Sequence, residues 1–198
     1  MFVYLYQINY LPLSAAAADS SITLSLIFPF AAIAYLLWRG NNPKSIIAKL
    51  GLKKKGLTVR TILLGILLFL AMLFTEMLLG LFQELTHIPL PTNVQALFAG
   101  LPLYFLVFAA FIAPFDEEVF FRGLLVPQIG IILSAFFFAL LHYLSYLSIS
   151  EFIISFVFGL LAGYTFKRTD SIYPSIIAHV LVNSMAVITL LYSMLIIV

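Results

Sequence analysis

Residues 97–126 read LFAGLPLYFLVFAAFIAPFDEEVFFRGLLV, and this stretch decides in which solvent the chain folds. The run is long enough to cross a bilayer, for which about 20 apolar residues suffice. Its charges are confined to one short piece, at Asp116, Glu117, Glu118 and Arg122. Ionisable groups inside an apolar span cost free energy and are functional candidates by default. The stretch therefore predicts a membrane helix that carries a functional site.

The rest of the chain has the composition of a membrane protein. Hydrophobic residues make up 64% of its 198 positions, charged residues 9%, and the mean hydropathy is +1.16. A soluble domain has roughly a quarter of its residues charged. We therefore expect an all-α polytopic transmembrane helix bundle, with one integral membrane domain over residues 1–198 and a motif-bearing core at 114–186. The chain has no cysteine, which excludes a cysteine protease.

Six segments are apolar enough to span a membrane, and they are separated by glycine, proline and polar residues. Their predicted bounds are 20–38, 57–83, 97–126, 128–147, 150–166 and 172–197. The first 13 residues are apolar but too short to span, and they lack the basic leading region of a signal peptide. We expect them to form an interfacial segment.

Lysine and arginine are concentrated between the first two spans and at the end of the fifth. The two groups are Arg39, Lys44, Lys49, Lys53, Lys54, Lys55 and Arg60, and Lys167 and Arg168. With six spans, both groups fall on one face of the membrane. The positive-inside rule makes that face cytoplasmic and places both termini outside. We expect a multi-pass protein of the cell membrane.

Within the first basic region, residues 42–51 predict a short helix. Asn42 is a good N-cap, Pro43 suits the first turn, and Gly51 suits the end. Ile46, Ile47 and Leu50 would give the helix an apolar face. With the lysines around it, this face suits the surface of an anionic leaflet. A merely solvated loop is the alternative.

Three predicted helices place polar residues at a similar depth. At about 1.5 Å per residue, Glu117, His142, His179 and Asn183 all fall in one slab, nearer the cytoplasmic side. His179 and Asn183 are four residues apart and share a helix face. Each group alone has a simpler interpretation, because a histidine can be a packing residue and a His/Asn pair can join two helices. Their joint occurrence indicates a site.

Other residues of these helices are expected to support this site. Glu118 and Arg122 are four apart and can form a structural ion pair. Phe138 lies one turn before His142 and can shield the imidazole from lipid. Glu117 is rotated by about 100° from Glu118, so the two carboxylates need not do the same job.

Three short motifs occur in order on these helices. Glu117-Glu118-Val-Phe-Phe-Arg122 matches E-E-x-x-x-R, Phe138-Ala-Leu-Leu-His142 matches F-x-x-x-H, and His179-Val-Leu-Val-Asn183 matches H-x-x-x-N. In order and spacing, the chain resembles the CAAX-protease and bacteriocin-processing superfamily, which includes the type II CAAX prenyl endopeptidases. The resemblance covers residues 114–186.

The resemblance implies an intramembrane endopeptidase of the glutamate type. Glu117 and His142 would hold and activate water, and His179 and Asn183 would donate hydrogen bonds to the oxyanion. The substrate would be a prenylated CAAX-like peptide or another membrane-associated peptide or protein. The remaining expected partner is the lipid bilayer, with no nucleic acid, and the oligomeric state is open. No cofactor is expected.

Two alternatives use the same polar residues. Two histidines and a glutamate can ligate zinc and leave a position for water, although the H-E-x-x-H spacing is absent. A non-enzymatic membrane protein, such as a transporter or an immunity-type binding protein, could also use a polar cavity. Transporters often contain two similar halves, whereas nearly all the polar groups here lie in the last four spans.

Overall fold

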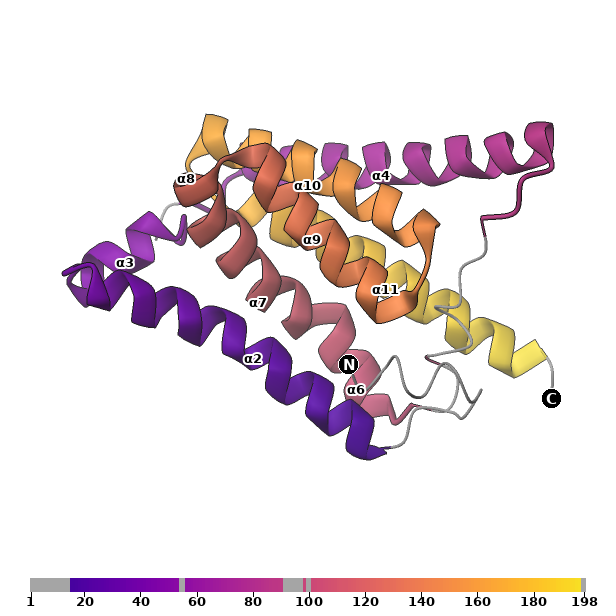
Figure 1. Ribbon diagram of the computed structural model, residues 1–198, viewed down its shortest axis with the longest axis horizontal. Coiled ribbons are helices and arrows are strands. Elements are labelled where there is room, and N and C mark those ends of the chain that lie inside the picture. The colour runs from indigo at the N-terminus through magenta and orange to yellow at the C-terminus, as the bar shows by residue number, and fades with distance from the viewer. Residues whose placement is uncertain (1–14, 54–55, 91–97, 99–100, 197–198) are drawn as a thin grey trace.

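The computed structural model describes residues 15–53, 56–90, 98 and 101–196, and within these ranges the chain is helical with short connections (Figure 1). No strand occurs among the described residues. The polytopic helix bundle expected from the sequence is therefore confirmed. The predicted interfacial segment, residues 1–13, lies outside the described residues.

Four of the six predicted spans are single helices that are long and apolar enough to cross a membrane. They are α2 (Ala15–Trp38), α4 (Val59–Thr86), α10 (Ile149–Thr169) and α11 (Tyr173–Ile196). The predicted fourth span is α9 (Ile131–Tyr146), whose 16 residues make it the shortest of these helices. At 1.5 Å per residue it reaches about 24 Å, less than the roughly 30 Å hydrocarbon core of a bilayer.

The predicted third span is a continuous helical run, but it is not one regular α-helix. It consists of α6 (Leu103–Val107), the π-helical segment η1 (Phe108–Ile112), α7 (Ala113–Glu118), the π-helical segment η2 (Val119–Leu125) and α8 (Val126–Ile129). The predicted bounds of 97–126 and 128–147 place a break at residue 127, and this break is wrong, because the run continues to Ile129. The chain turns at Gly130, whose φ of +85° is a conformation that glycine adopts without strain.

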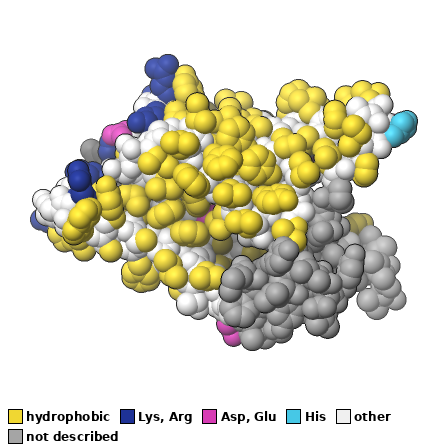
Figure 2. Space-filling view, viewed as in Figure 1, with side chains coloured by type: hydrophobic (Ala, Val, Ile, Leu, Met, Phe, Trp, Pro, Cys, Tyr) yellow, Lys and Arg dark blue, Asp and Glu magenta, His cyan; other side chains and the backbone are white. Residues whose placement is uncertain are grey.

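The surface matches an apolar solvent. Leucine, isoleucine and phenylalanine side chains are exposed along α2, α4 and α9, whereas lysine and arginine gather at one end of the molecule (Figure 2). That end contains α3 (Pro43–Lys49) and α8 (Figure 1). The apolar surface and the charged end fit a protein whose flanks contact lipid.

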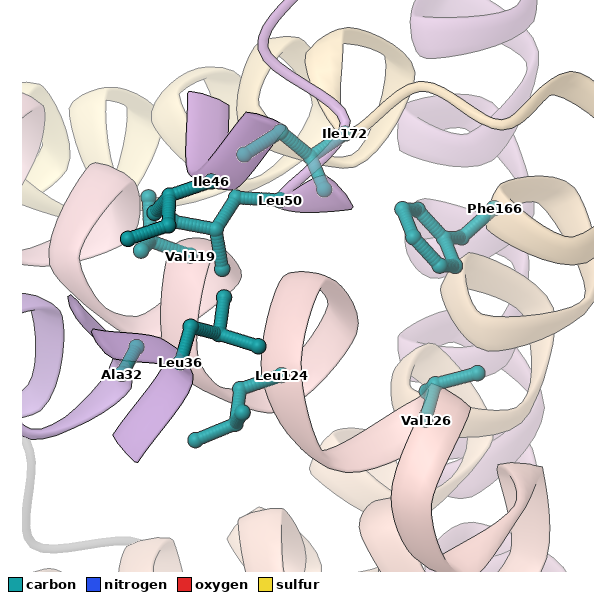
Figure 3. Packing of buried hydrophobic residues seen from close by; sticks show 9 residues of the cluster. All are labelled: Ala32, Leu36, Ile46, Leu50, Val119, Leu124, Val126, Phe166 and Ile172. Carbon is teal, nitrogen blue, oxygen red and sulfur yellow. The ribbon is translucent and has the colours of Figure 1, made fainter. Parts of the chain in front are cut away.

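Helix α3 begins as predicted but packs differently. The Asn42 side chain accepts a hydrogen bond from the Ser45 amide at 2.9 Å, and Pro43 takes the first turn. Ile46 and Leu50 are buried in a cluster with side chains from α2, η2 and α10 (Figure 3). Only Ile47 of the predicted apolar face is exposed. The predicted membrane-binding face is therefore mostly part of the protein core.

Close helix contacts position the site. Helices α9 and α10 pack side by side where Gly159 faces Ala135, and a Cβ at Gly159 would lie 2.7 Å from the Ala135 backbone. Helices α4 and α11 meet similarly at Gly65 and Ile177. Small residues allow such backbone approaches between membrane helices.

Candidate active site

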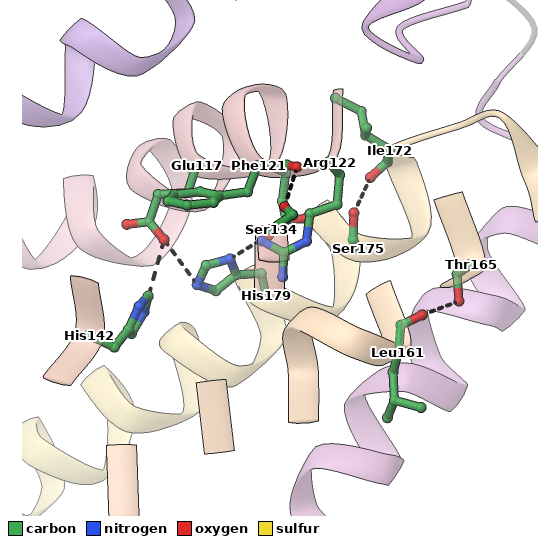
Figure 4. Close-up of polar contacts among 11 residues, drawn as sticks. Glu117, Phe121, Arg122, Ser134, His142, Leu161, Thr165, Ile172, Ser175 and His179 are labelled. Atoms are coloured by element: carbon green, nitrogen blue, oxygen red, sulfur yellow. Dashed lines mark hydrogen bonds and ion pairs between the residues drawn. The ribbon is translucent and has the colours of Figure 1, made fainter. Parts of the chain in front are cut away.

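Glu117, His142 and His179 meet inside the bundle, although they come from α7, α9 and α11. Glu117 Oε2 lies 4.0 Å from His142 Nε2 and 3.9 Å from His179 Nε2 (Figure 4). The three side chains are only 7–16% exposed. Glu117 Oε2 is buried and has no hydrogen-bond partner among the described residues. The structure thus brings together three of the four residues that the sequence predicted as catalytic.

The other ring nitrogen of each histidine fixes its orientation. His142 Nδ1 lies 2.9 Å from the Phe138 carbonyl oxygen, which can only accept a hydrogen bond. His179 Nδ1 lies 3.1 Å from Glu118 Oε1. Both Nδ1 atoms therefore act as donors, and both Nε2 atoms are directed to Glu117. Such a partner on one nitrogen is the usual way in which a protein sets the chemistry of the other.

Glu118 and Arg122 form the predicted ion pair at the base of the site. Arg122 Nε lies 3.0 Å from Glu118 Oε2, and both side chains are at most 1% exposed. The N–O distance is short enough for a hydrogen bond, but the angle at the hydrogen is not suitable. Arg122 Nε and Glu118 Oε2 therefore have no hydrogen-bond partner among the described residues. We therefore treat it as a buried ion pair that also orients His179 through Glu118.

Two aromatic rings enclose the guanidinium group. The Arg122 Cζ atom lies 4.1 Å from the ring centre of Phe138 and 4.9 Å from that of Phe158. Phe138 also contacts His142, with 4.4 Å between ring centres, as the sequence predicted. Phe158 was missed, because one phenylalanine in an apolar span carries no distinguishing signal. Cation–π contacts of this kind stabilise a desolvated cation.

Three consecutive carboxylates of α7 face three different environments. Asp116 accepts a hydrogen bond from Ser25 Oγ of α2 at 3.1 Å. Glu117 faces α9 and α11, and Glu118 faces Arg122 and His179. Successive residues of an α-helix are rotated by about 100°, which separates the carboxylates in this way. The π-helical segments η1 and η2 flank α7, and such segments often occur at functional sites.

Asn183 lies in a different contact from the other site residues. Its Nδ2 atom donates to the Ala109 carbonyl of η1 at 2.8 Å. In the i+5 register of η1, the Ala113 amide bonds the Phe108 carbonyl, so the Ala109 carbonyl would bond residue 114. Residue 114 is proline and has no N–H. Asn183 therefore satisfies a carbonyl that Pro114 leaves free, a role that the sequence did not predict.

The three central side chains also form a possible metal-ligand group. The ligand atoms of Glu117, His142 and His179 lie within 4.8 Å of one another. Zinc bonds of about 2.0–2.1 Å in a tetrahedral site place ligand atoms about 3.3 Å apart. The observed separations of Glu117 Oε2 from the two Nε2 atoms, 3.9 and 4.0 Å, are longer. The donor set fits zinc, whereas the side-chain positions would have to contract around it.

The fold and this site define an integral membrane protein with a buried glutamate–histidine site above an ion pair. Residues 99–185 match the family model described as Type II CAAX prenyl endopeptidase Rce1-like. The match covers less than half of the chain and includes all three motifs, so it confirms the resemblance to the CAAX-protease and bacteriocin-processing superfamily. It supports a CAAX-type intramembrane endopeptidase in general. Comparisons with curated proteins and with solved structures found no match.

Proposed function

We propose that the protein is a glutamate-type intramembrane endopeptidase in which Glu117 and His142 activate water. The observation that carries this proposal is the placement of Glu117 Oε2 at 3.9–4.0 Å from two imidazole nitrogens. If a water lies about 2.8 Å from Glu117 Oε2 and about 2.8 Å from one Nε2, the angle between these two contacts at the water oxygen is about 90°. The ligand atoms of all three residues lie within 4.8 Å of one another, so one water can contact all three groups.

The charges around this water support a division of roles. If His179 donates from Nδ1 to Glu118 and from Nε2 into the site, it carries a positive charge. The positive charges of His179 and Arg122 then balance the negative charges of Glu117 and Glu118, the carboxylates that they contact. His142 stays neutral, and its Nε2 accepts a hydrogen bond from the water. Balanced charges reduce the cost of burying ionised groups in a bundle.

The reaction follows from these roles. Glu117 takes a proton from the water as the oxygen attacks the peptide carbonyl carbon. The resulting oxyanion accepts hydrogen bonds from His179 Nε2 and from the second Nδ2 hydrogen of Asn183. The C–N bond then breaks, and the proton held by Glu117 passes to the leaving nitrogen. In this scheme, side chains of this chain supply a base for the water, donors for the oxyanion and a proton for the leaving nitrogen.

The substrate class is a membrane-associated peptide or protein, and prenylated CAAX-like tails are the first group to test. The Glu117 and His142 side chains are 16% and 15% exposed, so the edge of the site meets the surface, whereas Glu117 Oε2 itself is buried. Membrane proteomics of a Glu117→Ala strain against wild type would test the function. A peptide or protein that stays uncut only in the variant would support the proposed function. Identical proteomic profiles of the two strains, with the protein expressed in both, would contradict it.

Zinc-dependent hydrolysis is the second candidate, favoured by the same three ligand atoms. The long separations favour the metal-free mechanism, so we expect the purified enzyme to contain no stoichiometric metal and to retain activity after strong chelation. Metal content by mass spectrometry and cleavage before and after chelation provide the measurement. Activity that is lost on chelation and restored by zinc would establish the zinc mechanism instead.

Replacement of Asn183 should have two separable effects. Asn183→Ala removes an oxyanion donor, for which the usual loss is about 10²–10³-fold in rate. It also leaves the Ala109 carbonyl unpaired, at a cost of about 1–3 kcal/mol. Cleavage assays and thermal unfolding in detergent would measure the two effects.

The double variant Pro114→Ala/Asn183→Ala separates them. Replacing the proline with alanine supplies a backbone N–H that can bond the Ala109 carbonyl, so stability should recover while the rate stays low. Recovery of the rate together with stability would restrict Asn183 to the structural role.

The topology is also part of this proposal, with the basic end in the cytoplasm of a multi-pass cell-membrane protein. Because the chain has no cysteine, Lys44→Cys provides a unique label site at an exposed position of α3. We expect this cysteine to react with a membrane-impermeant maleimide only after the cells are opened. Labelling of this cysteine in intact cells would show that the basic end lies outside the cell and would contradict the proposed orientation.

A further inference from the structure

The basic end of the bundle contains a cavity of about 700 Å³ that is separate from the glutamate–histidine site. Its walls come from the end of α2, from α3, from the junction of η2 with α8, and from the end of α10. Four of its lining residues are cationic, namely Arg39, Lys49, Lys53 and Lys167, and one is acidic, Asp170.

Three of the four cations are not neutralised by an acidic side chain of the described residues. Lys53 Nζ pairs with Asp170 at 2.6 Å, and Lys49 Nζ contacts the Asn41 side-chain oxygen. Arg39, Lys49 and Lys167 have no acidic partner among the described residues. The cavity therefore keeps an excess of about three positive charges by formal count. It is suited to an anion.

Aromatic side chains place the cavity at the membrane interface. Tyr35 lines it and donates a hydrogen bond to Gln128 Oε1 at 3.1 Å. Its ring lies 5.9 Å from that of Trp38, which is 78% exposed. Tyrosine and tryptophan are enriched at the level of lipid headgroups. Ile33 and Leu37 are exposed apolar residues of the same helix, α2, and acyl chains can lie against them.

We infer that this cavity binds the phosphate headgroup of an anionic phospholipid. Arg39, Lys49 and Lys167 contact the phosphate, and the acyl chains follow the exposed face of α2. Basic pockets between membrane helices are suited to anionic headgroups, because lysine and arginine near the membrane surface are attracted to the negative charge of anionic lipids. The inference is independent of the proposed proteolysis, since none of these residues belongs to the glutamate–histidine site.

Trp38 makes the inference testable, because it is the only tryptophan of the chain. Purified protein in neutral detergent would be titrated with phosphatidylglycerol or phosphatidylcholine carrying brominated acyl chains, which quench tryptophan fluorescence. We expect saturable quenching by phosphatidylglycerol at concentrations where phosphatidylcholine has little effect. Arg39→Gln/Lys167→Gln should weaken the apparent affinity about 30-fold, since each basic residue contributes about fivefold.

Lys44→Gln/Arg60→Gln is the matched control. It removes the same charge from the same basic end of the molecule, but neither residue lines the cavity. We expect it to weaken binding by less than about threefold, the residual effect of diffuse attraction. An equal loss in both double variants, or equal quenching by the two lipids, would overturn the inference. Competition by inorganic phosphate at the same concentration as the lipid would assign the cavity to a free anion and overturn the lipid assignment.

Discussion

Glu117→Gln is expected to reduce cleavage of a verified substrate by about 10²–10⁴-fold, the usual contribution of a general base. Glutamine keeps the size of the side chain and can still hold a water, but it cannot accept the proton. The fold should be unchanged, because Glu117 Oε2 has no hydrogen-bond partner to lose among the described residues. Single-turnover cleavage and thermal unfolding in detergent would measure the two properties.

Asp116→Asn is the matched control for this variant. It removes the adjacent carboxylate, which faces Ser25 of α2 and not the two histidines. We expect it to retain most of the activity. Full proteolysis by Glu117→Gln would disprove the assignment of Glu117 as the base. If the wild-type protein cuts no substrate either, a non-enzymatic binding protein becomes the better interpretation.

Arg122→Ala is expected to destabilise the protein by about 3–5 kcal/mol, because it leaves a buried carboxylate without its cation. Glu118 would keep its contact with His179 but lose the arginine, and the contacts of the guanidinium with Phe138 and Phe158 would be lost. We expect a lower melting temperature and lower expression. Thermal unfolding in detergent would measure the change.

Two further variants identify the cause of that loss. Glu118→Gln/Arg122→Met removes both charges, keeps an acceptor for His179 Nδ1, and should recover most of the stability. Lys53→Ala breaks the exposed pair with Asp170 and should cost only about 0–1 kcal/mol. If Arg122→Ala were as mild as Lys53→Ala, the buried pair would not support the fold.

Much of this protein was predictable from its sequence, because the relevant signals are local. Long apolar runs between polar breaks determine where membrane helices form. Helical spacing predicts the Glu118–Arg122 pair, the contact of Phe138 with His142, and the separate directions of Glu117 and Glu118. The three motifs predicted the family resemblance for the same reason, since each lies within a few turns of one helix.

Contacts between distant segments were decided only by the tertiary structure. The apolar face of α3 suits a membrane surface equally well, and only packing against α2, η2 and α10 places Ile46 and Leu50 in the core. The contact of Phe158 with Arg122 and the hydrogen bond from Asn183 to the Ala109 carbonyl likewise join different helices. The sequence by itself determined which helices form and which polar groups each carries. Only the packing of those helices decided which groups meet, because the free energy of each contact depends on burial that no single helix supplies.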